Sequence, residues 1–356
     1  MCESQSIGTT EGKVQVRAFK PPSSQSAFLV QWGPEGHAAF HRGCWDSLIK
    51  HGQVGEVEKS MVTEARKTAE YHDGDAEFQK EAKRIADMIM TSTHCIAFTG
   101  AGISTAAGIG DFRGIDGKWT DREKKQNYGA SSSSKSKRNY RLQELRPTYT
   151  HEAIAHLTET DNIKFVISQN TDGLHRLSGI PAGMLSELHG NAFANKCEKC
   201  NTWVDLPTRQ PIVSVPPKKC PRCNINHRTG RMCLKPGCGG YMMNTIINFG
   251  DFLEDDVLNK AQDSAKRADL VLCLGTTLRV SPANSLVEMA QAPLRLIICN
   301  RQVTPYDEDT RNGSRVYGDC DRLMKLVMSH ILPCEQLEEW EGRRPERMAK
   351  YDSLRK

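Results

Sequence analysis

The sequence lacks the long apolar run that a membrane-spanning helix needs, because no uninterrupted apolar stretch approaches about 18 residues. Its first residues, Met1 to Gln5, lack the basic-then-apolar order of a secretion signal. No G-x-S-x-G motif is present to suggest a serine nucleophile. The net charge is only +5 over 356 residues, and the basic residues are dispersed, so charge alone does not demand an acidic partner. We expect an intracellular globular protein without membrane contact.

Cysteine, in contrast, is frequent and clustered. Of the 13 cysteines, six fall between residues 197 and 238, whereas a disulfide framework would spread its cysteines along the chain. Closely spaced pairs in a reducing compartment favour zinc, and a site of four thiolates leaves no open position, which is typical of structural zinc. The first pair must combine with one of the other two, so six cysteines exceed one site. The pairs are Cys197/Cys200, Cys220/Cys223 and Cys233/Cys238.

The periodicity of the apolar residues predicts an α/β fold. Phe78, Ala82, Ile85 and Ile89 repeat at helical spacing, and short apolar runs of strand type occur in four places. Helical sequence lies near them, at 254–267 and 282–291, and such alternation indicates a doubly wound parallel sheet, a Rossmann-like fold. The cysteine-rich stretch interrupts the alternation, so we interpret residues 190–245 as an inserted small domain. The predicted strands are 95–99, 165–168, 270–274 and 294–299.

Three regions follow from these patterns. Residues 1–75 form an N-terminal extension, with a predicted strand at 27–32 and a short helix at 44–49; residues 76–334 form the main domain. Residues 335–356 are a highly charged C-terminal tail that we expect to be poorly ordered. We expect the same of the Ser- and Lys-rich stretch at 130–138, whose basic end is a candidate contact for nucleic acid or for nuclear import.

Polar residues follow the predicted strands where ligands gather in parallel sheets. A glycine turn comes after the first strand, where glycine lets the backbone approach a pyrophosphate, although Thr105 occupies the third position of the usual glycine fingerprint. Amide and carboxylate side chains after the other strands suit the ribose hydroxyls and carboxamide of a nicotinamide nucleotide. The segments are Gly100-Ala101-Gly102, Asp111-Phe112-Arg113, Gln169-Asn170-Thr171-Asp172, Gly275-Thr276-Thr277 and Asn300-Arg301-Gln302.

His189 stands between these strand ends and the cysteine pairs. It precedes Gly190 at the junction of the main domain and the small domain, which is a usual place for a cleft. The ordinary pKa of histidine suits a proton acceptor near neutral pH. We therefore interpret His189 as the candidate general base.

Together these segments resemble the sirtuin family of NAD-dependent protein deacylases, over residues 76 to 332. The motifs that carry the resemblance are the glycine turn with Ile103-Ser104, the Asp111-Phe112-Arg113 run, Gln169-Asn170-x-Asp172-Gly173-Leu174-His175, His189-Gly190 and Gly275-Thr276-Thr277. Details are similar to the class IV branch, which includes nuclear chromatin sirtuins. These details are Gly117-x-Trp119-Thr120, Gly230-Arg231-Met232-Cys233 and the run from Asn244 to Asp251.

The resemblance implies an assignment of site residues. It implies one structural zinc ion held by Cys197, Cys200, Cys233 and Cys238, and it makes His189 the base that takes a ribose hydroxyl proton. Departures from the family pattern are Gly110 in place of proline, the long Ser- and Lys-rich stretch, and Cys220 with Cys223, which would compete as ligands. The implied NAD-binding residues are Gly100, Ala101, Gly102, Thr105, Asp111, Phe112, Arg113, Trp119, Gln169, Asn170, Asp172, Gly275, Thr276, Thr277, Asn300, Arg301, Gln302 and Cys320.

The resemblance also implies the reaction. An acyl-lysine protein and NAD would give free lysine, nicotinamide and O-acyl-ADP-ribose, with the peptide pairing as a strand near 248–250. Histones are the expected substrates and the nucleus the expected location, with the cytoplasm as the alternative. Two other functions stay open, namely protein mono-ADP-ribosyl transfer and a chromatin-binding module with residual catalysis.

Overall fold

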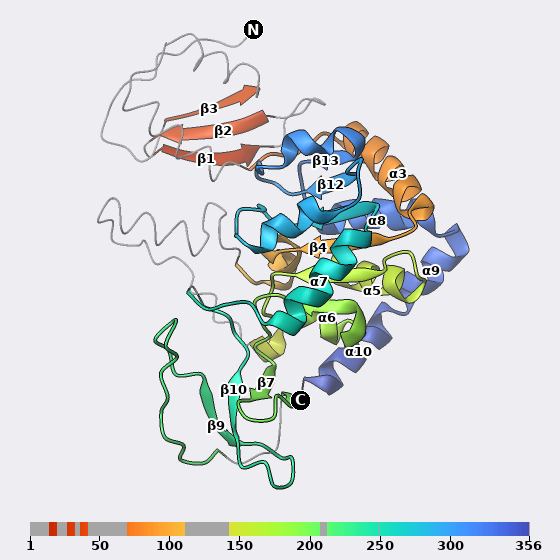
Figure 1. Ribbon diagram of the computed structural model, residues 1–356. Helices are drawn as coiled ribbons and strands as arrows, with labels where there is room; N and C mark the ends of the chain where they lie inside the picture. The colour runs from red at the N-terminus through yellow and green to blue at the C-terminus, as the bar shows by residue number, and fades with distance from the viewer. Residues whose placement is uncertain are drawn as a thin grey trace.

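The computed structural model describes residues 70–110, 142–206, 212–248 and 250–355, together with the backbone of three N-terminal strands. These strands are β1 (Val14–Phe19), β2 (Ala27–Trp32) and β3 (Gly36–His41), and they form an antiparallel sheet in the order β1-β2-β3. The predicted strand at 27–32 is confirmed, whereas the predicted helix at 44–49 lies outside the described residues. Figure 1 shows this sheet at the end of the molecule opposite the small domain.

A six-stranded parallel sheet forms the centre of the main domain, as the sequence predicts. Its order is β13-β12-β11-β4-β5-β6, which in sequence terms is the 3-2-1-4-5-6 order of a Rossmann-like sheet. The order reverses between β4 and β11, so a ligand crevice is expected at their carboxyl ends. The strands are β4 (Cys95–Thr99), β5 (Phe165–Ser168), β6 (Leu185–Glu187), β11 (Leu270–Leu274), β12 (Leu296–Cys299) and β13 (Ser314–Val316).

Helices cover both faces of this sheet, because alternate strand residues point to opposite sides and apolar residues lie on both. One face packs against α3 (Asp75–Thr91), α5 (Tyr149–Glu159) and α8 (Cys320–Ile331). The other packs against α7 (Asp255–Arg267) and the 3-10 helix η4 (Ala283–Met289). The helices predicted from 78 to 89 and from 254 to 267 are confirmed, while the helical stretch predicted at 282–291 is a 3-10 helix. No helix among the described residues is long and apolar enough to cross a membrane.

The shorter elements connect the strands of the main domain. After β4 comes the 3-10 helix η1 (Ala101–Ala107), and η2 (Leu142–Glu144) precedes α5. Between β5 and β6 lie α6 (Leu174–Leu177) and η3 (Ala182–Met184), and η5 (Asp307–Asn312) precedes β13. The glycine turn thus leads directly into a helix of the tighter 3-10 form.

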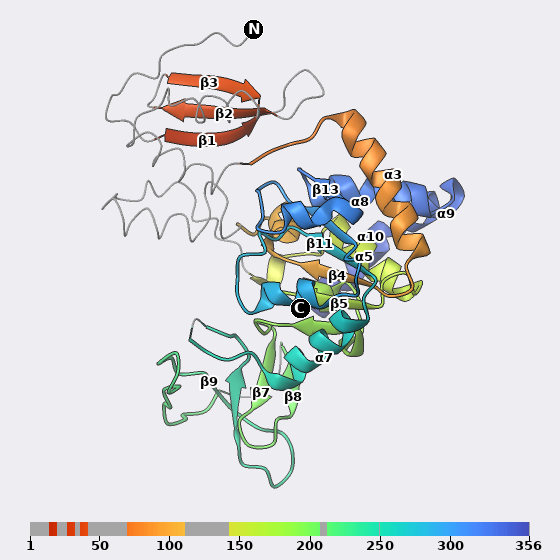
Figure 2. The same ribbon diagram turned by 45° about the horizontal axis from the view of Figure 1, so that its top comes forward.

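The predicted inserted domain is a separate antiparallel sheet. Its strands are β7 (Ala194–Cys197), β8 (Trp203–Asp205), β9 (Arg228–Met232) and β10 (Tyr241–Asn244), in the order β8-β7-β10-β9. Its apolar core is small and contains Cys197, Cys238 and Met242, with Cys200 and Cys233 packed against it. Both ribbon views show this sheet at the end of the main domain that lies away from β13 (Figures 1 and 2). A core this small needs another source of stability, and its cysteines indicate that this source is a bound metal ion.

The C-terminal residues are ordered, contrary to the expectation of a poorly ordered tail. They form α9 (Cys334–Gly342) and α10 (Arg344–Leu354), which run along the outside of α5 in Figure 1. The Glu152 carboxylate, almost fully buried in α5, accepts hydrogen bonds from Arg344 at 3.0 Å and Arg347 at 3.2 Å. Tyr351 packs into an apolar cluster with Leu145 and the short helix α6. Two of the charged residues of this segment, Arg344 and Arg347, are therefore paired with the buried Glu152 carboxylate.

Replacing Tyr351 by alanine should destabilise the main domain by about 3 kcal/mol, as truncation of a buried aromatic ring commonly does. Lys350→Ala changes an exposed position on the same helix and should have little effect. Chemical unfolding of the two variants checks this. Equal unfolding free energies for both variants would show that α10 does not pack on the domain.

Candidate functional site

Three glycines bring the carboxyl ends of β4 and β11 into direct contact. The N–H of Gly100 donates to Leu274 at 3.0 Å, and the N–H of Gly102 donates to the Gly275 carbonyl at 2.8 Å. A Cβ on Gly100 would stand 2.7 Å from the Gly275 oxygen, and a Cβ on Gly102 would stand 2.6 Å from its Cα. Gly275 has a φ of +62°, a conformation that favours glycine. Side chains are therefore excluded at this point, and a ligand can approach the backbone.

Buried polar side chains from η1 and from the segment after β5 are hydrogen-bonded to one another beside the glycine turn. The amide of Asn170 donates to the Gly100 carbonyl at 3.0 Å and to the Ser104 hydroxyl at 3.2 Å. Ser104 in turn donates to Asp172 at 2.7 Å, and the other Asp172 oxygen accepts the N–H of Leu174 at 2.9 Å. This network fixes Asn170 and Asp172 at the edge where the sequence placed them. Sequence reasoning did not include Ser104 among the binding residues, although it lies within the quoted glycine motif.

An open cleft lies over the glycine contact. Seven of its lining residues were predicted from sequence to bind the nucleotide. Sequence reasoning missed the other three, Glu70, Gly318 and Asp319. The predicted lining residues are Gly102, Thr105, Gly275, Asn300, Arg301, Gln302 and Cys320.

Neighbouring groups pair the charge of Arg301 in this cleft and keep the Cys320 thiol protonated. Asp319 caps the N-terminus of α8 and holds Arg301 in an ion pair of 2.9 Å. A hydrogen bond with Cys299 and burial raise the pKa of the Cys320 thiol well above its usual range. Cys320 therefore lines the cleft as a neutral thiol. The signal for Asp319 was present in the sequence, since an aspartate directly before a helix is a typical N-cap.

The remaining predicted residues are placed as follows. Thr276 is buried and accepts a hydrogen bond from the Gln169 amide at 2.9 Å, and Thr277 follows it half-buried. Ala101 begins η1 directly after Gly100. Asp111, Phe112, Arg113 and Trp119 lie outside the described residues, as does the Ser- and Lys-rich stretch.

His189 is held with one ring nitrogen fixed and the other left basic. Its Nδ1 lies 2.9 Å from the carbonyl oxygen of Gln169, and because a carbonyl only accepts, Nδ1 must carry the proton. Nε2 then carries the lone pair. Burial lowers the pKa of His189 from its ordinary value, and the bond to the Gln169 carbonyl offsets part of that shift. The histidine is therefore neutral near pH 7 and able to accept a proton at Nε2.

The loop after His189 is pinned to the small domain. The His189 carbonyl accepts the N–H of Ile247 at 3.0 Å, and a Cβ on Gly190 would overlap the Thr245 carbonyl. Only glycine fits at position 190, where φ is +79°. The candidate base is therefore attached both to β5, through Gln169, and to the segment that follows β10.

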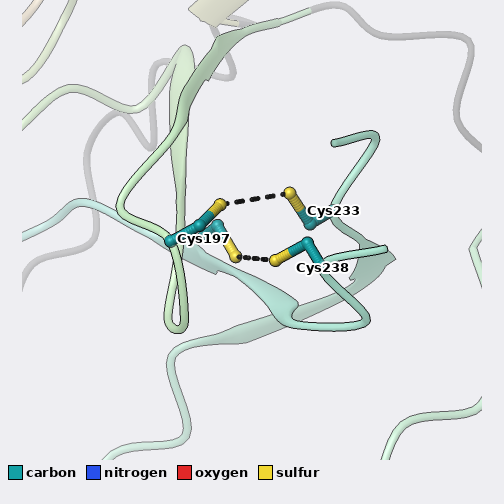
Figure 3. A group of neighbouring side chains, drawn as sticks. Cys197, Cys233 and Cys238 are labelled. Atoms are coloured by element: carbon teal, nitrogen blue, oxygen red, sulfur yellow. Dashed lines mark hydrogen bonds between the residues drawn. The ribbon is translucent and has the colours of Figure 1, made fainter. Parts of the chain in front are cut away.

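Four cysteines of the small domain converge as the sequence resemblance implied. Cys197 Sγ lies 3.6 Å from Cys238 Sγ, and Cys200 Sγ lies 3.5 Å from Cys233 Sγ (Figure 3). A tetrahedral zinc ion with Zn–S bonds of about 2.3 Å sets its sulfurs about 3.8 Å apart. The cluster therefore fits one zinc ion. Cys220 and Cys223 do not join it and lie instead in a second group with His227 and Asp251.

The chain is similar in sequence to known proteins of one family. The sequence profile of the Sir2 family matches residues 100–282. The chain is 35% identical over 287 residues to NAD-dependent protein deacetylase sirtuin-7 of Bos taurus, covering 78% of this chain and 66% of that protein. It is 37% identical over 239 residues to an NAD-dependent protein deacetylase of Sulfolobus acidocaldarius, covering 64% of this chain and 87% of that protein. The match to the bovine relative thus spans just under two thirds of its length.

A solved structure shows the same likeness. The chain matches a mutant Sir2 homologue in complex with ADP-ribose with a TM-score of 0.53 at 26% identity, covering 70% of this chain and 95% of that chain.

The imidazole of His189 should titrate below pH 6.5, because burial favours its neutral form. Histidine-selective ¹⁵N NMR over a pH series measures this, with the His189→Gln variant identifying the signal. The same spectra report the tautomer, which should be protonated on Nδ1. A pKa above 6.5 or a proton on Nε2 would contradict the proposed proton acceptor.

Proposed function

The chain belongs to the Sir2 family, and from that membership we propose that it is an NAD-dependent protein-lysine deacylase. The proposed reaction converts acyl-lysine, NAD and water to lysine, nicotinamide and O-acyl-ADP-ribose. The observation that carries the proposal is His189, whose Nδ1 proton is bound by the Gln169 carbonyl, so that Nε2 carries the lone pair that can accept a proton. Bovine sirtuin-7 and the Sulfolobus relative, both named as NAD-dependent protein deacetylases, support the reaction type.

The position and the backbone floor of the cleft suit a dinucleotide such as NAD. The cleft lies where the strand order reverses, and its floor is backbone, because side chains on Gly100, Gly102 or Gly275 would collide with neighbouring atoms. When bound, NAD supplies an electrophilic ribose carbon from which nicotinamide departs. Thr105 and Gly102 would then face the phosphates, while Asn300 and Gln302 would contact the adenosine side of the cleft.

Asn170 and Asp172 would hold the nicotinamide ribose. Both are more than nine-tenths buried and fixed by Ser104 and the Gly100 carbonyl, so they do not need to reorganise when the nucleotide binds. Such preorganisation places the reacting ribose in one orientation. From the sequence resemblance, we assign Phe112 to covering that ribose, Arg113 to holding the loop and Trp119 to contacting the nucleotide.

His189 would act as the general base. Its Nε2 takes the proton of a ribose hydroxyl, so that the hydroxyl oxygen becomes a nucleophile toward the acyl carbon. The imidazolium that forms keeps its Nδ1 hydrogen bond to Gln169, which stabilises the positive charge. His189 Nε2 can then give this proton back to the product, which restores the neutral imidazole.

The four-cysteine cluster would hold a structural zinc ion. Cys197, Cys200, Cys233 and Cys238 fill all four positions of a tetrahedron, so no position is open to a substrate or water. We therefore assign this zinc to folding of the small domain rather than to the reaction.

The acyl-lysine peptide would enter between the two domains and pair as a strand near 248–250, next to Ile247, whose N–H is bonded to the His189 carbonyl. From the resemblance to the class IV branch, we propose acylated histones in the nucleus as the substrates. Contact of the basic stretch at 135–138 with nucleic acid belongs to the same proposal.

His189→Tyr should lower acyl-peptide turnover on the order of 100-fold or more, because the ribose hydroxyl loses its proton acceptor. The test is mass spectrometry of acetylated and long-chain acylated histone peptides incubated with NAD. Cys334→Ser, an exposed position on α9, serves as the control and should keep wild-type turnover. Near-normal turnover by His189→Tyr would make the histidine structural, and ADP-ribosylated protein as the main product would favour the transferase alternative.

A further inference from the structure

A second set of metal-ligand side chains lies in the small domain, apart from the four-cysteine cluster. The ligand atoms of Cys220, Cys223, His227 and Asp251 all lie within 4.8 Å of one another. Cys223 Sγ is 3.1 Å from His227 Nε2, Cys220 Sγ is 3.3 Å from an Asp251 oxygen, and His227 Nε2 is 3.6 Å from the other Asp251 oxygen. Mixed sulfur, nitrogen and oxygen ligands of tetrahedral zinc stand about 3.3 to 3.8 Å apart. The spacing therefore approximates an assembled zinc site.

The turn that carries Cys220 and Cys223 repeats the turn of the first cysteine pair. Residues 196–201 read Lys-Cys-Glu-Lys-Cys-Asn, and residues 219–224 read Lys-Cys-Pro-Arg-Cys-Asn. In both, the asparagine adopts a left-handed conformation, with φ of 58° at Asn201 and 59° at Asn224.

The backbone hydrogen bonds of the two turns also correspond. Asn201 donates its N–H to the Cys197 carbonyl at 3.1 Å, and Asn224 donates to the Cys220 carbonyl at 3.0 Å. The N–H of each leading cysteine donates to the carbonyl five residues later, at 2.9 Å in both turns. The same local fold that presents two thiolates to the first cluster therefore presents two to the second.

Neighbouring residues orient His227 and Asp251 as metal ligands. The Asn244 side-chain amide donates to the His227 carbonyl at 3.2 Å, which turns the Asn244 oxygen toward His227 Nδ1 at 3.2 Å. Nδ1 therefore carries the proton, and Nε2 directs its lone pair into the cluster. One oxygen of Asp251 accepts the Asn248 N–H at 3.1 Å, which leaves its other oxygen toward Cys220.

Packing and charge agree with a bound cation. The side chains of His227 and Asp251 are only 14% and 9% exposed, yet their partners in the cluster are thiols, which are weak hydrogen-bond donors. A divalent cation would convert these contacts into strong bonds and leave a net charge of −1 from two thiolates, one carboxylate and a neutral histidine. Sulfur and imidazole ligands select zinc over magnesium or calcium.

We propose that Cys220, Cys223, His227 and Asp251 bind a second, structural zinc ion. This gives two zinc ions in each chain, in place of the single ion predicted from the sequence. The site joins the loop before β9 to the segment after β10, and that segment is bonded to His189 through Ile247. The second zinc thus fixes the small-domain side of the candidate active site, and its existence does not depend on the proposed reaction.

Zinc content of the full chain, purified under reducing conditions without chelator, tests the proposal. Wild type should carry two ions per chain, and Cys223→Ser and His227→Ala should each carry one. Cys334→Ser removes an exposed cysteine outside both clusters and should keep two. One ion in wild type, two ions retained in Cys223→Ser, or a Cys220–Cys223 disulfide in the purified protein would overturn the site.

Cobalt substitution of the wild-type protein gives a test that does not depend on variants folding. Thiolate-to-cobalt absorption should rise through two equivalents of Co²⁺, and one of the two should show about half the absorption of the other, because two thiolates replace four. Saturation at one equivalent would overturn the proposal. Hydrogen exchange of the amides at 244–248 should also quicken in His227→Ala and stay unchanged in Cys334→Ser, whatever the enzymatic activity proves to be.

Discussion

The close contact between Gly100, Gly102 and Gly275 is the constraint on which the rest of the site depends. A methyl group on any of the three would collide with backbone atoms of the opposing strand end, so β4 and β11 can meet only where side chains are absent. This contact lies where the strand order of the sheet reverses. It leaves a backbone floor beneath the cleft and fixes the turn to which Asn170 and Ser104 are bonded.

From that floor a short chain of hydrogen bonds reaches both domains. Gln169 follows β5, bonds Thr276 on the β11 side, and holds the ring of His189 through its carbonyl. His189 in turn accepts the N–H of Ile247 from the segment leading out of the small domain. Thr276 after β11, the candidate base His189 and Ile247 after β10 are thus joined by one connected set of hydrogen bonds.

The elements that short apolar runs and glycines determine could be predicted from the sequence, whereas those that depend on tertiary contacts could not. The four buried strands with apolar runs were predictable, whereas β6 and β13 have three residues each and carry no run of their own. The charged C-terminus was expected to be poorly ordered because the buried acceptor Glu152 lies almost 200 residues away. The choice among cysteine pairs came from resemblance, since spacing alone left it open. Asp251 could not be recognised as a ligand from the sequence, because it lies after β10, far along the chain from Cys220 and Cys223.

The central claim is that this geometry performs NAD-dependent removal of acyl groups from lysine, with the acyl group transferred to the ribose. The most direct measurement is the mass balance of a single reaction of the wild-type protein with NAD and an acylated histone peptide, followed by quantitative mass spectrometry. The account predicts nicotinamide, deacylated peptide and O-acyl-ADP-ribose in equal amounts. Nicotinamide release without loss of the acyl group, or deacylation that yields free carboxylic acid without NAD consumption, would contradict it.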